Sequence, residues 1–314
     1  MNAPFEPMKM PWAPPALPDD LPHGDMPGDS VQIGEAHIRK TNVIYPELRK
    51  MLSAAFHENP IRRAVVAICG GSGVGKSEIA SLLAHYIRAE GVGSYTLSGD
   101  NYPHRIPRYN DAERLRIFRH EGVRGLVRGG QYTPERFGVL RALQQEDRDA
   151  DPALTAAYPW METYLREGSA ALGRYLGSAA EINFDELNGI VSQYKSGAAG
   201  VYLKRMGRDE TALWYDMVDF PKACVLLIEW THSNSDYLHG VDIPILLNST
   251  PEETLAHRKA RHRDGGADSP FTTMVLALEQ KQLQRQAVKA KLIVSKSGEL
   301  LSYPEYLKTM PEDK

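Results

Sequence analysis

Hydrophobic positions are most regular between residues 64 and 98. Residues 64–69 (AVVAIC) form an unbroken apolar run with several β-branched side chains, which predicts a strand buried on both faces, as in a parallel sheet. In residues 76–90 the apolar side chains recur on one helix face: Ile79, Leu82, Leu83, Tyr86 and Ile87. Glycines then end this helix, and residues 95–98 (YTLS) predict the next short strand. Strand, helix and strand at this spacing predict a βαβ unit.

Similar patterns predict the other elements. Apolar runs at 225–228, 243–247 and 291–294 predict three more strands, with Pro244 near a strand start or at an edge. A helix is expected at 43–57, with Pro46 in its first turn, and a long one at 271–289. Further helix starts are predicted at four capping residues: Asn110, Thr133, Asn183 and Thr250. Residues 110–215 are therefore expected to be mainly helical, and 140–215 to form a distinct insertion that binds an acceptor.

The first 30 residues hold eight of the 21 prolines of the 314-residue chain. Because proline fixes φ and removes a backbone donor, this arm cannot be a central strand or a helix interior. It is expected to lie as an extended tail on its own domain or to be disordered; a polyproline ligand, or an arm packed on a partner subunit, is the alternative. The domain boundaries expected are an arm at 1–30 and a main domain at 31–314.

The net charge and the cysteine content exclude some kinds of partner and some cellular locations. The chain has 37 basic and 40 acidic residues, a net charge of −3, which excludes a polyanion binder held by bulk positive charge. Its two cysteines, Cys69 and Cys224, lie in or beside apolar runs and predict buried thiols in a reducing compartment. No apolar stretch is long enough to span a membrane and no signal peptide is visible, so a cytoplasmic location is expected.

One motif carries specific chemistry. The segment Gly70-Gly71-Ser72-Gly73-Val74-Gly75-Lys76-Ser77 fits G-x-x-x-x-G-K-[ST], follows a predicted buried strand and opens a predicted helix, the context of a P-loop. Glycines let successive backbone N–H groups surround phosphate oxygens, and the positive end of the helix points at them. Lys76 is expected to reach the β- and γ-phosphates of ATP and Ser77 to hold Mg²⁺.

Two acids follow predicted strands. Asp100 comes directly after the strand at 95–98, which places it at the carboxyl end of a strand beside the P-loop, where it could accept the proton of an acceptor hydroxyl. The alternative is an aspartate that belongs to the turn and has no catalytic role. Glu229 closes the strand at 225–228 and could serve Mg²⁺ through water, or simply face solvent.

Two basic segments are candidate anion sites. Arg258, Arg261 and Arg263 lie at a helix end before a glycine pair, so they could fold over the transferring phosphates as a lid. Tyr102, His104, Arg105 and Arg108 follow Asp100 closely and could bind the acceptor. Each segment could instead be a solvated helix surface, and binding of nucleic acid is disfavoured because the basic run lacks interleaved aromatic residues.

These features together resemble the phosphoribulokinase/uridine kinase family of P-loop small-molecule kinases. The resemblance rests on the loop 70–77, the strand end 98–102, the strand 225–229 and the helix 258–263, and covers roughly residues 60–300. It implies that Asp100 is the base toward the acceptor hydroxyl, that the three arginines form the lid, and that the enzyme uses ATP and Mg²⁺ and commonly forms oligomers. The chain departs from the family pattern at Trp230, where glycine is usual, and at Lys195 after Tyr194, where aspartate often follows.

The expected fold is a three-layer α/β P-loop sandwich with a mostly parallel sheet and a helical insertion. The expected function is ATP-dependent transfer of the γ-phosphoryl group to a hydroxyl of a small metabolite, such as a nucleoside, a sugar phosphate or a vitamin precursor. The alternative is a regulatory P-loop NTPase coupled to a protein partner.

Overall fold

The computed structural model describes residues 12–18, 21, 23–209, 211–220, 225–261 and 269–310, without the side chains of residues 257, 260 and 261. The chain contacts divide it into two compact units. The first, here called the sheet unit, comprises Met1–Tyr102, Asn183–Ser249 and Leu283–Lys314. The second, the helical unit, comprises Pro103–Ile182 and Thr250–Gln282.

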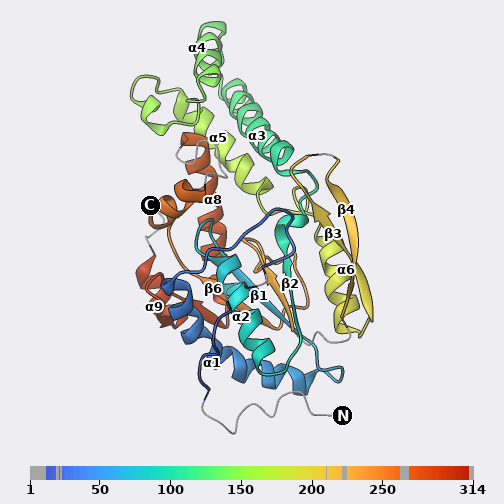
Figure 1. Ribbon diagram of the computed structural model, residues 1–314. Helices are drawn as coiled ribbons and strands as arrows, with labels where there is room; N and C mark the ends of the chain where they lie inside the picture. The colour runs from blue at the N-terminus through green and yellow to red at the C-terminus, as the bar shows by residue number, and fades with distance from the viewer. Residues whose placement is uncertain are drawn as a thin grey trace. The chain divides into compact units, whose positions relative to one another are not determined.

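A six-stranded sheet forms the centre of the sheet unit, in the order β2-β5-β1-β6-β7-β8. Strands β1, β2 and β6 of this sheet are labelled in Figure 1. Its strands are β1 (Ala64–Gly70), β2 (Ser94–Ser98), β5 (Val225–Glu229), β6 (Ile243–Leu247), β7 (Leu292–Val294) and β8 (Leu300–Leu301). All neighbours run parallel except β7 and β8. The predicted strands are thus confirmed, and Pro244 is the second residue of β6, near the strand start as expected.

Both faces of this sheet are buried: every residue of β1 and β5 is shielded from solvent, and all but the terminal Glu229 of β5 lack a polar side chain. Helices α1 (Glu35–Glu58) and α2 (Lys76–Ala89) share a core with one face. On the other face, Cys69 and Leu246 pack with the end of α8 (Pro270–Gln286) and with α9 (Tyr303–Thr309). The α/β architecture with a mostly parallel sheet therefore follows the prediction, and Cys69 is a buried thiol; Cys224 lies outside the described residues.

Helix α1 corrects one expectation. It begins at Glu35 and not at residue 43, so Pro46 lies inside the helix. A proline there removes one backbone hydrogen bond to the preceding turn. The helix continues nevertheless because its buried face carries large side chains on both sides of the proline: Ile44, Tyr45, Leu48, Leu52 and Phe56. Tertiary packing therefore outweighs the preference of proline for the first turn of a helix.

A hairpin of β3 (Gly200–Met206) and β4 (Leu213–Asp219) follows α6 (Phe184–Lys195). The sequence did not predict this hairpin, since residues up to 215 were expected to be mainly helical. The start of α6 was predicted correctly: the side chain of Asn183 accepts a hydrogen bond from the amide of Glu186. Residues 183–215 belong by their contacts to the sheet unit, so the helical unit and the predicted insertion share only 110–182.

The helical unit is built from α3 (Pro107–Arg128), α4 (Pro134–Gln145), α5 (Met161–Tyr175), α7 (Pro251–Arg261) and most of α8. Phe118, Tyr164 and Leu172 lie at the centre of its core. The predicted caps at Thr133 and Thr250 both form, whereas α3 begins three residues before Asn110. A proline at its first position explains that earlier start.

The described part of the N-terminal arm packs on the sheet unit. The Trp12 ring lies 5.1 Å from that of Tyr45 and 5.6 Å from that of Tyr86, measured between centroids. Leu21 joins the same core. The described part of the arm thus packs on its own unit. Across the described ranges, no helix has the length and apolar character needed to cross a bilayer.

Candidate active site

The loop between β1 and α2 has a backbone that only glycine adopts easily. Gly70, Gly73 and Gly75 have φ values of 154°, 77° and 93°. A Cβ at Gly70 would stand 2.6 Å from the carbonyl oxygen of Leu247, so a side chain is excluded there by contact as well. The amides of this loop precede the N-terminus of a helix of 14 residues, which is the geometry that favours an anion. The strand–loop–helix context expected from the motif is therefore present.

Two side chains of the loop region have partners within the protein. The Lys76 Nζ atom donates to the carbonyl oxygen of Gly71, 3.0 Å away. The Ser77 hydroxyl donates to the Glu229 carboxylate at 3.1 Å. Lys76 is thereby folded along its own loop, and Ser77 joins the loop to the end of β5.

Glu229 lies between the loop and the turn that carries Asp100. In the sheet register it is paired with Ile68 of β1 on one side and with Ser98 of β2 on the other. Its side chain is buried rather than solvent-facing, with 4% of the residue exposed. Burial, followed by the negative charge of Asp100, raises the pKa of Glu229 to about 8.

Asp100 is the middle residue of a short 3-10 turn, Gly99–Asn101, at the carboxyl end of β2, and it is exposed. The sequence placed it on a strand directly beside the P-loop, which is wrong, because β5 is inserted between β1 and β2. With neighbouring strands about 4.8 Å apart, the two strand ends are separated by roughly 10 Å.

Trp230, the residue that departs from the family pattern, closes the space behind this turn. A Cβ added to Gly99 would overlap the Trp230 indole, so the turn and the ring are in close contact. The ring also lies 5.8 Å from that of Phe184 and 5.1 Å from that of His232, between centroids. The backbone that carries Asp100 therefore rests on an aromatic surface.

The predicted acceptor residues have different environments. Tyr102 is fully buried in the sheet unit, and its hydroxyl has no hydrogen-bond partner among the residues that the structure describes. The other three belong to the helical unit. His104 Nε2 lies 3.1 Å from the Ala179 carbonyl oxygen, and Arg105 donates to the Tyr175 hydroxyl at 3.1 Å. Arg108 is exposed and lies 5.9 Å above the ring of Tyr109.

Only one of the predicted lid arginines can be described fully. Arg258 donates from Nη1 to the Pro251 carbonyl oxygen at 2.8 Å and to the Thr254 hydroxyl at 2.7 Å, both in its own helix α7. Arg261 ends α7, but its side chain lies outside the described part of the chain, as does Arg263 altogether. A lid role for the three residues stays a prediction.

One buried acid near Asp100 was missed from the sequence. Asp25, from the N-terminal arm, accepts hydrogen bonds from the Ser98 amide at 2.7 Å and from the Asn101 side chain at 3.1 Å. No local signal distinguishes it, because it is one of several acids among prolines and lies about 75 residues away in sequence.

The donor atoms near the loop suit Mg²⁺. They are the Ser77 hydroxyl and the Glu229 carboxylate, and oxygen ligands are those that this ion prefers. A nearby cation would also stabilise the ionised form of a carboxyl group whose pKa is raised by burial. Within the described ranges no group of three or more His, Cys, Asp or Glu side chains forms a metal site, so the ion would need phosphate and water oxygens as well.

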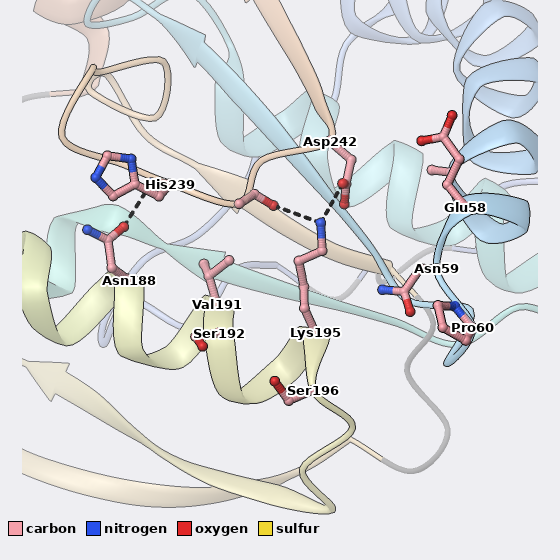
Figure 2. Close-up of a pocket in the computed structure, with 12 residues that line it drawn as sticks. Glu58, Asn59, Pro60, Asn188, Val191, Ser192, Lys195, Ser196, His239 and Asp242 are labelled. Carbon is pink, nitrogen blue, oxygen red and sulfur yellow. Dashed lines mark hydrogen bonds and ion pairs between the residues drawn. The ribbon is translucent and has the colours of Figure 1, made fainter.

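A separate pocket of about 590 Å³ lies at the amino end of β1 (Figure 2). There the Asp242 carboxylate accepts the Val65 amide at 2.8 Å and the Lys195 ammonium at 2.5 Å. The Asn188 side chain spans the chain at 237–239, accepting from the His239 amide at 2.9 Å. These polar groups satisfy one another, and the pocket lies at the opposite end of β1 from the glycine loop.

No family model matches the chain. Over 270 residues, or 86% of its length, it is 34% identical to the bifunctional alpha-galactosidase/sucrose kinase AgaSK of Mediterraneibacter gnavus. The chain spans only 24% of the length of that relative. Among solved structures the chain is similar to a protein of Silicibacter sp. TM1040 that is provisionally named as a fructose transport system kinase. The two are 16% identical and superpose with a TM-score of 0.41 over 73% of this chain and 92% of that chain.

Proposed function

We propose that the chain is a P-loop kinase that transfers the γ-phosphoryl group of ATP to a hydroxyl of a small metabolite. The observation that carries this proposal is the order of three groups across adjacent strands: Lys76 after β1, Glu229 at the end of β5 and Asp100 after β2. Parallel α/β sheets bind ligands at the carboxyl ends of their strands. The similarity to a relative whose name includes sucrose kinase supports the same class of reaction.

In this proposal, loop 70–77 holds the triphosphate. Its backbone amides and the start of α2 would bind the phosphate oxygens, and Lys76 would leave the Gly71 carbonyl for the β- and γ-phosphates. Mg²⁺ would neutralise phosphate charge, with Ser77 as a ligand and Glu229 holding one of its waters.

The transfer step assigned to Asp100 is a general-base step. As the acceptor oxygen forms its bond to the γ-phosphorus, the Asp100 carboxylate takes the proton of the hydroxyl, and the bond from the γ-phosphorus to the β,γ-bridging oxygen breaks to release ADP. An exposed carboxylate at the carboxyl end of β2, roughly 10 Å from the end of the loop strand, supports this role, since parallel sheets bind ligands at this edge.

We further propose a sugar hydroxyl as the acceptor, because the relative named as a sucrose kinase provides the best indication of substrate class. Tyr102, His104, Arg105 and Arg108 stay as proposed acceptor residues, with Tyr102 acting through packing since its side chain is buried. Arg258, Arg261 and Arg263 stay as a proposed lid. Membership of the phosphoribulokinase/uridine kinase family, a cytoplasmic location and a homo-oligomer likewise remain proposals.

A test measures ADP release with Mg²⁺ and ATP against unphosphorylated sugars, including sucrose, fructose and galactose, and against sugar phosphates and nucleosides. We expect slow hydrolysis alone and at least a tenfold faster release with one unphosphorylated sugar. The rival, an NTPase coupled to a protein partner, predicts stimulation by a macromolecule and by no metabolite. The described part of the arm gives that rival little support, since it packs on its own unit.

A further inference from the structure

Asp25 has an unusual set of partners for a residue in a proline-rich arm. Its carboxylate accepts four hydrogen bonds: from the Ser98 amide at 2.7 Å, the Tyr95 hydroxyl at 2.9 Å, the Arg205 guanidinium at 3.0 Å and the Asn101 side chain at 3.1 Å. The side chains of Asp25 and Arg205 are each only 8% exposed. A carboxylate this well satisfied is fixed in position.

Two of these partners flank the turn that carries Asp100. Ser98 precedes Gly99, Asp100 and Asn101, and Asn101 ends the turn, so the Asp25 carboxylate bridges its two ends. Asn101 is held from a further direction, because its side-chain oxygen accepts the amide of Met206 at 2.9 Å. The turn is thus tied to the arm and to the hairpin, while the Asp100 side chain between these ties stays exposed.

The same arm segment reaches the second acid of the site. A Cβ on Gly24 would stand 3.6 Å from Glu229 Oε1 and 3.5 Å from Thr96 Cγ2, which is ordinary van der Waals contact. Residues 24 and 25 therefore line the ends of both β5 and β2. The arm covers Glu229 and at the same time binds the turn of Asp100.

From these contacts we infer that Asp25 is a positioning residue of the active site: it holds the turn that presents Asp100 to the acceptor hydroxyl. This inference rests on the proposed function of Asp100. Its chemistry requires an acceptor-only side chain, because all four partners are donors. Asparagine would turn an NH₂ group toward at least one of these donors. It would also remove the buried negative charge that faces Arg205, whose other carboxylate partner, Asp216, is half-exposed.

The test compares Asp25→Asn with a matched control, Asp242→Asn. Asp242 is also a partly buried aspartate that accepts a strand amide and a basic side chain, but it lies at the amino end of β1. For Asp25→Asn we expect kcat to fall tenfold to a hundredfold, with the Kd of a fluorescent ATP analogue changed less than twofold. Amide hydrogen exchange at residues 98–101 should quicken in that variant only. Asp242→Asn should keep kcat within a factor of two.

A second variant guards against misfolding of Asp25→Asn. Asn101→Ser removes the tie at one end of the turn and leaves the pair of Asp25 and Arg205 intact, so it should show the same loss of kcat with unchanged analogue affinity. Wild-type kcat in either variant, or an equal loss in Asp242→Asn, overturns the inference. If the wild-type protein shows no turnover with any acceptor, the proposed function fails, and hydrogen exchange then tests the role of Asp25 by itself. Unchanged exchange at residues 98–101 in Asp25→Asn overturns that role, and faster exchange supports it.

Discussion

The indole of Trp230 lies against Gly99, so closely that a single methyl group on Gly99 would overlap the ring. Gly99 directly follows β2 and precedes Asp100, and Trp230 directly follows β5, the neighbouring strand. The large ring after Glu229 thus requires a residue without a side chain in the turn that carries Asp100.

Gly99→Ala should therefore displace the turn. We expect a loss of about 1–3 kcal/mol in the free energy of unfolding, typical of overpacking a filled site, together with a marked fall in kcat. Thermal or denaturant unfolding and ADP release measure the two effects. Gly189→Ala is the control, because a Cβ there meets nothing within 4 Å, and it should leave stability unchanged or slightly raised. Equal stability of the two alanine variants would contradict the contact.

Lys76→Ala tests the phosphate-binding role of the loop. The Lys76 ammonium donates a hydrogen bond to the Gly71 carbonyl of its own loop, so the fold should survive the substitution. We expect turnover to fall by at least about a hundredfold, as when one preorganised transition-state contact is lost. Circular dichroism checks the fold and steady-state kinetics the rate. Turnover near that of the wild type would remove Lys76 from the mechanism.

Asp100→Asn separates binding from transfer. The amide keeps the size of the side chain but cannot accept a proton, so the acceptor-dependent rate should fall by about 10²–10⁴-fold. Because Asp100 lies in the turn after β2 and the loop follows β1, two strands away, affinity for a fluorescent ATP analogue should change little. A parallel loss of analogue affinity and rate would argue that Asp100 serves the nucleotide instead of the acceptor.

The raised pKa of Glu229 predicts that the stability of the protein, free of Mg²⁺ and nucleotide, depends on pH. Burial raises its pKa from 4.5 to about 8, so between these values the folded state binds more protons than the unfolded state. The contribution of Glu229 to the free energy of unfolding is greatest below pH 4.5 and declines as the pH rises toward 8. Denaturant unfolding at several pH values should show this decline in the wild type and a flatter curve in Glu229→Gln. Parallel curves would show that Glu229 titrates normally.

Local sequence was sufficient for the elements that depend on neighbouring residues. The strand at 64–70, the glycine loop and the helix from Lys76 are encoded within about 25 residues by an apolar run, glycines with positive φ and a repeating apolar face. The caps at Thr133, Asn183 and Thr250 are equally local, since each side chain bonds an amide three residues away. These features could be predicted without any knowledge of tertiary contacts.

The hairpin at 200–219 escaped prediction for a different reason. Strand β4 is exposed along most of its length, including Trp214 and Met217, so burial leaves no clean alternation in its sequence. Helix α1 differs from its prediction because of packing. Pro46 locally favours a helix that begins near it, but burial of Tyr45 and Leu48 keeps the chain helical on both sides of the proline. For α1 the deciding contacts are with distant parts of the chain, because its buried face packs in the core of the sheet unit.

The sequence by itself determined which residues could bind phosphate and which acids end strands, because those properties depend on residue type and short spacing. Only the tertiary structure decided how they are arranged. It inserted β5 between β1 and β2, and so placed Glu229 between the glycine loop and Asp100. It also brought Asp25 from the arm to the turn of Asp100. Strand order and long-range hydrogen bonds depend on which surfaces pack together, and no short segment of the chain encodes that choice.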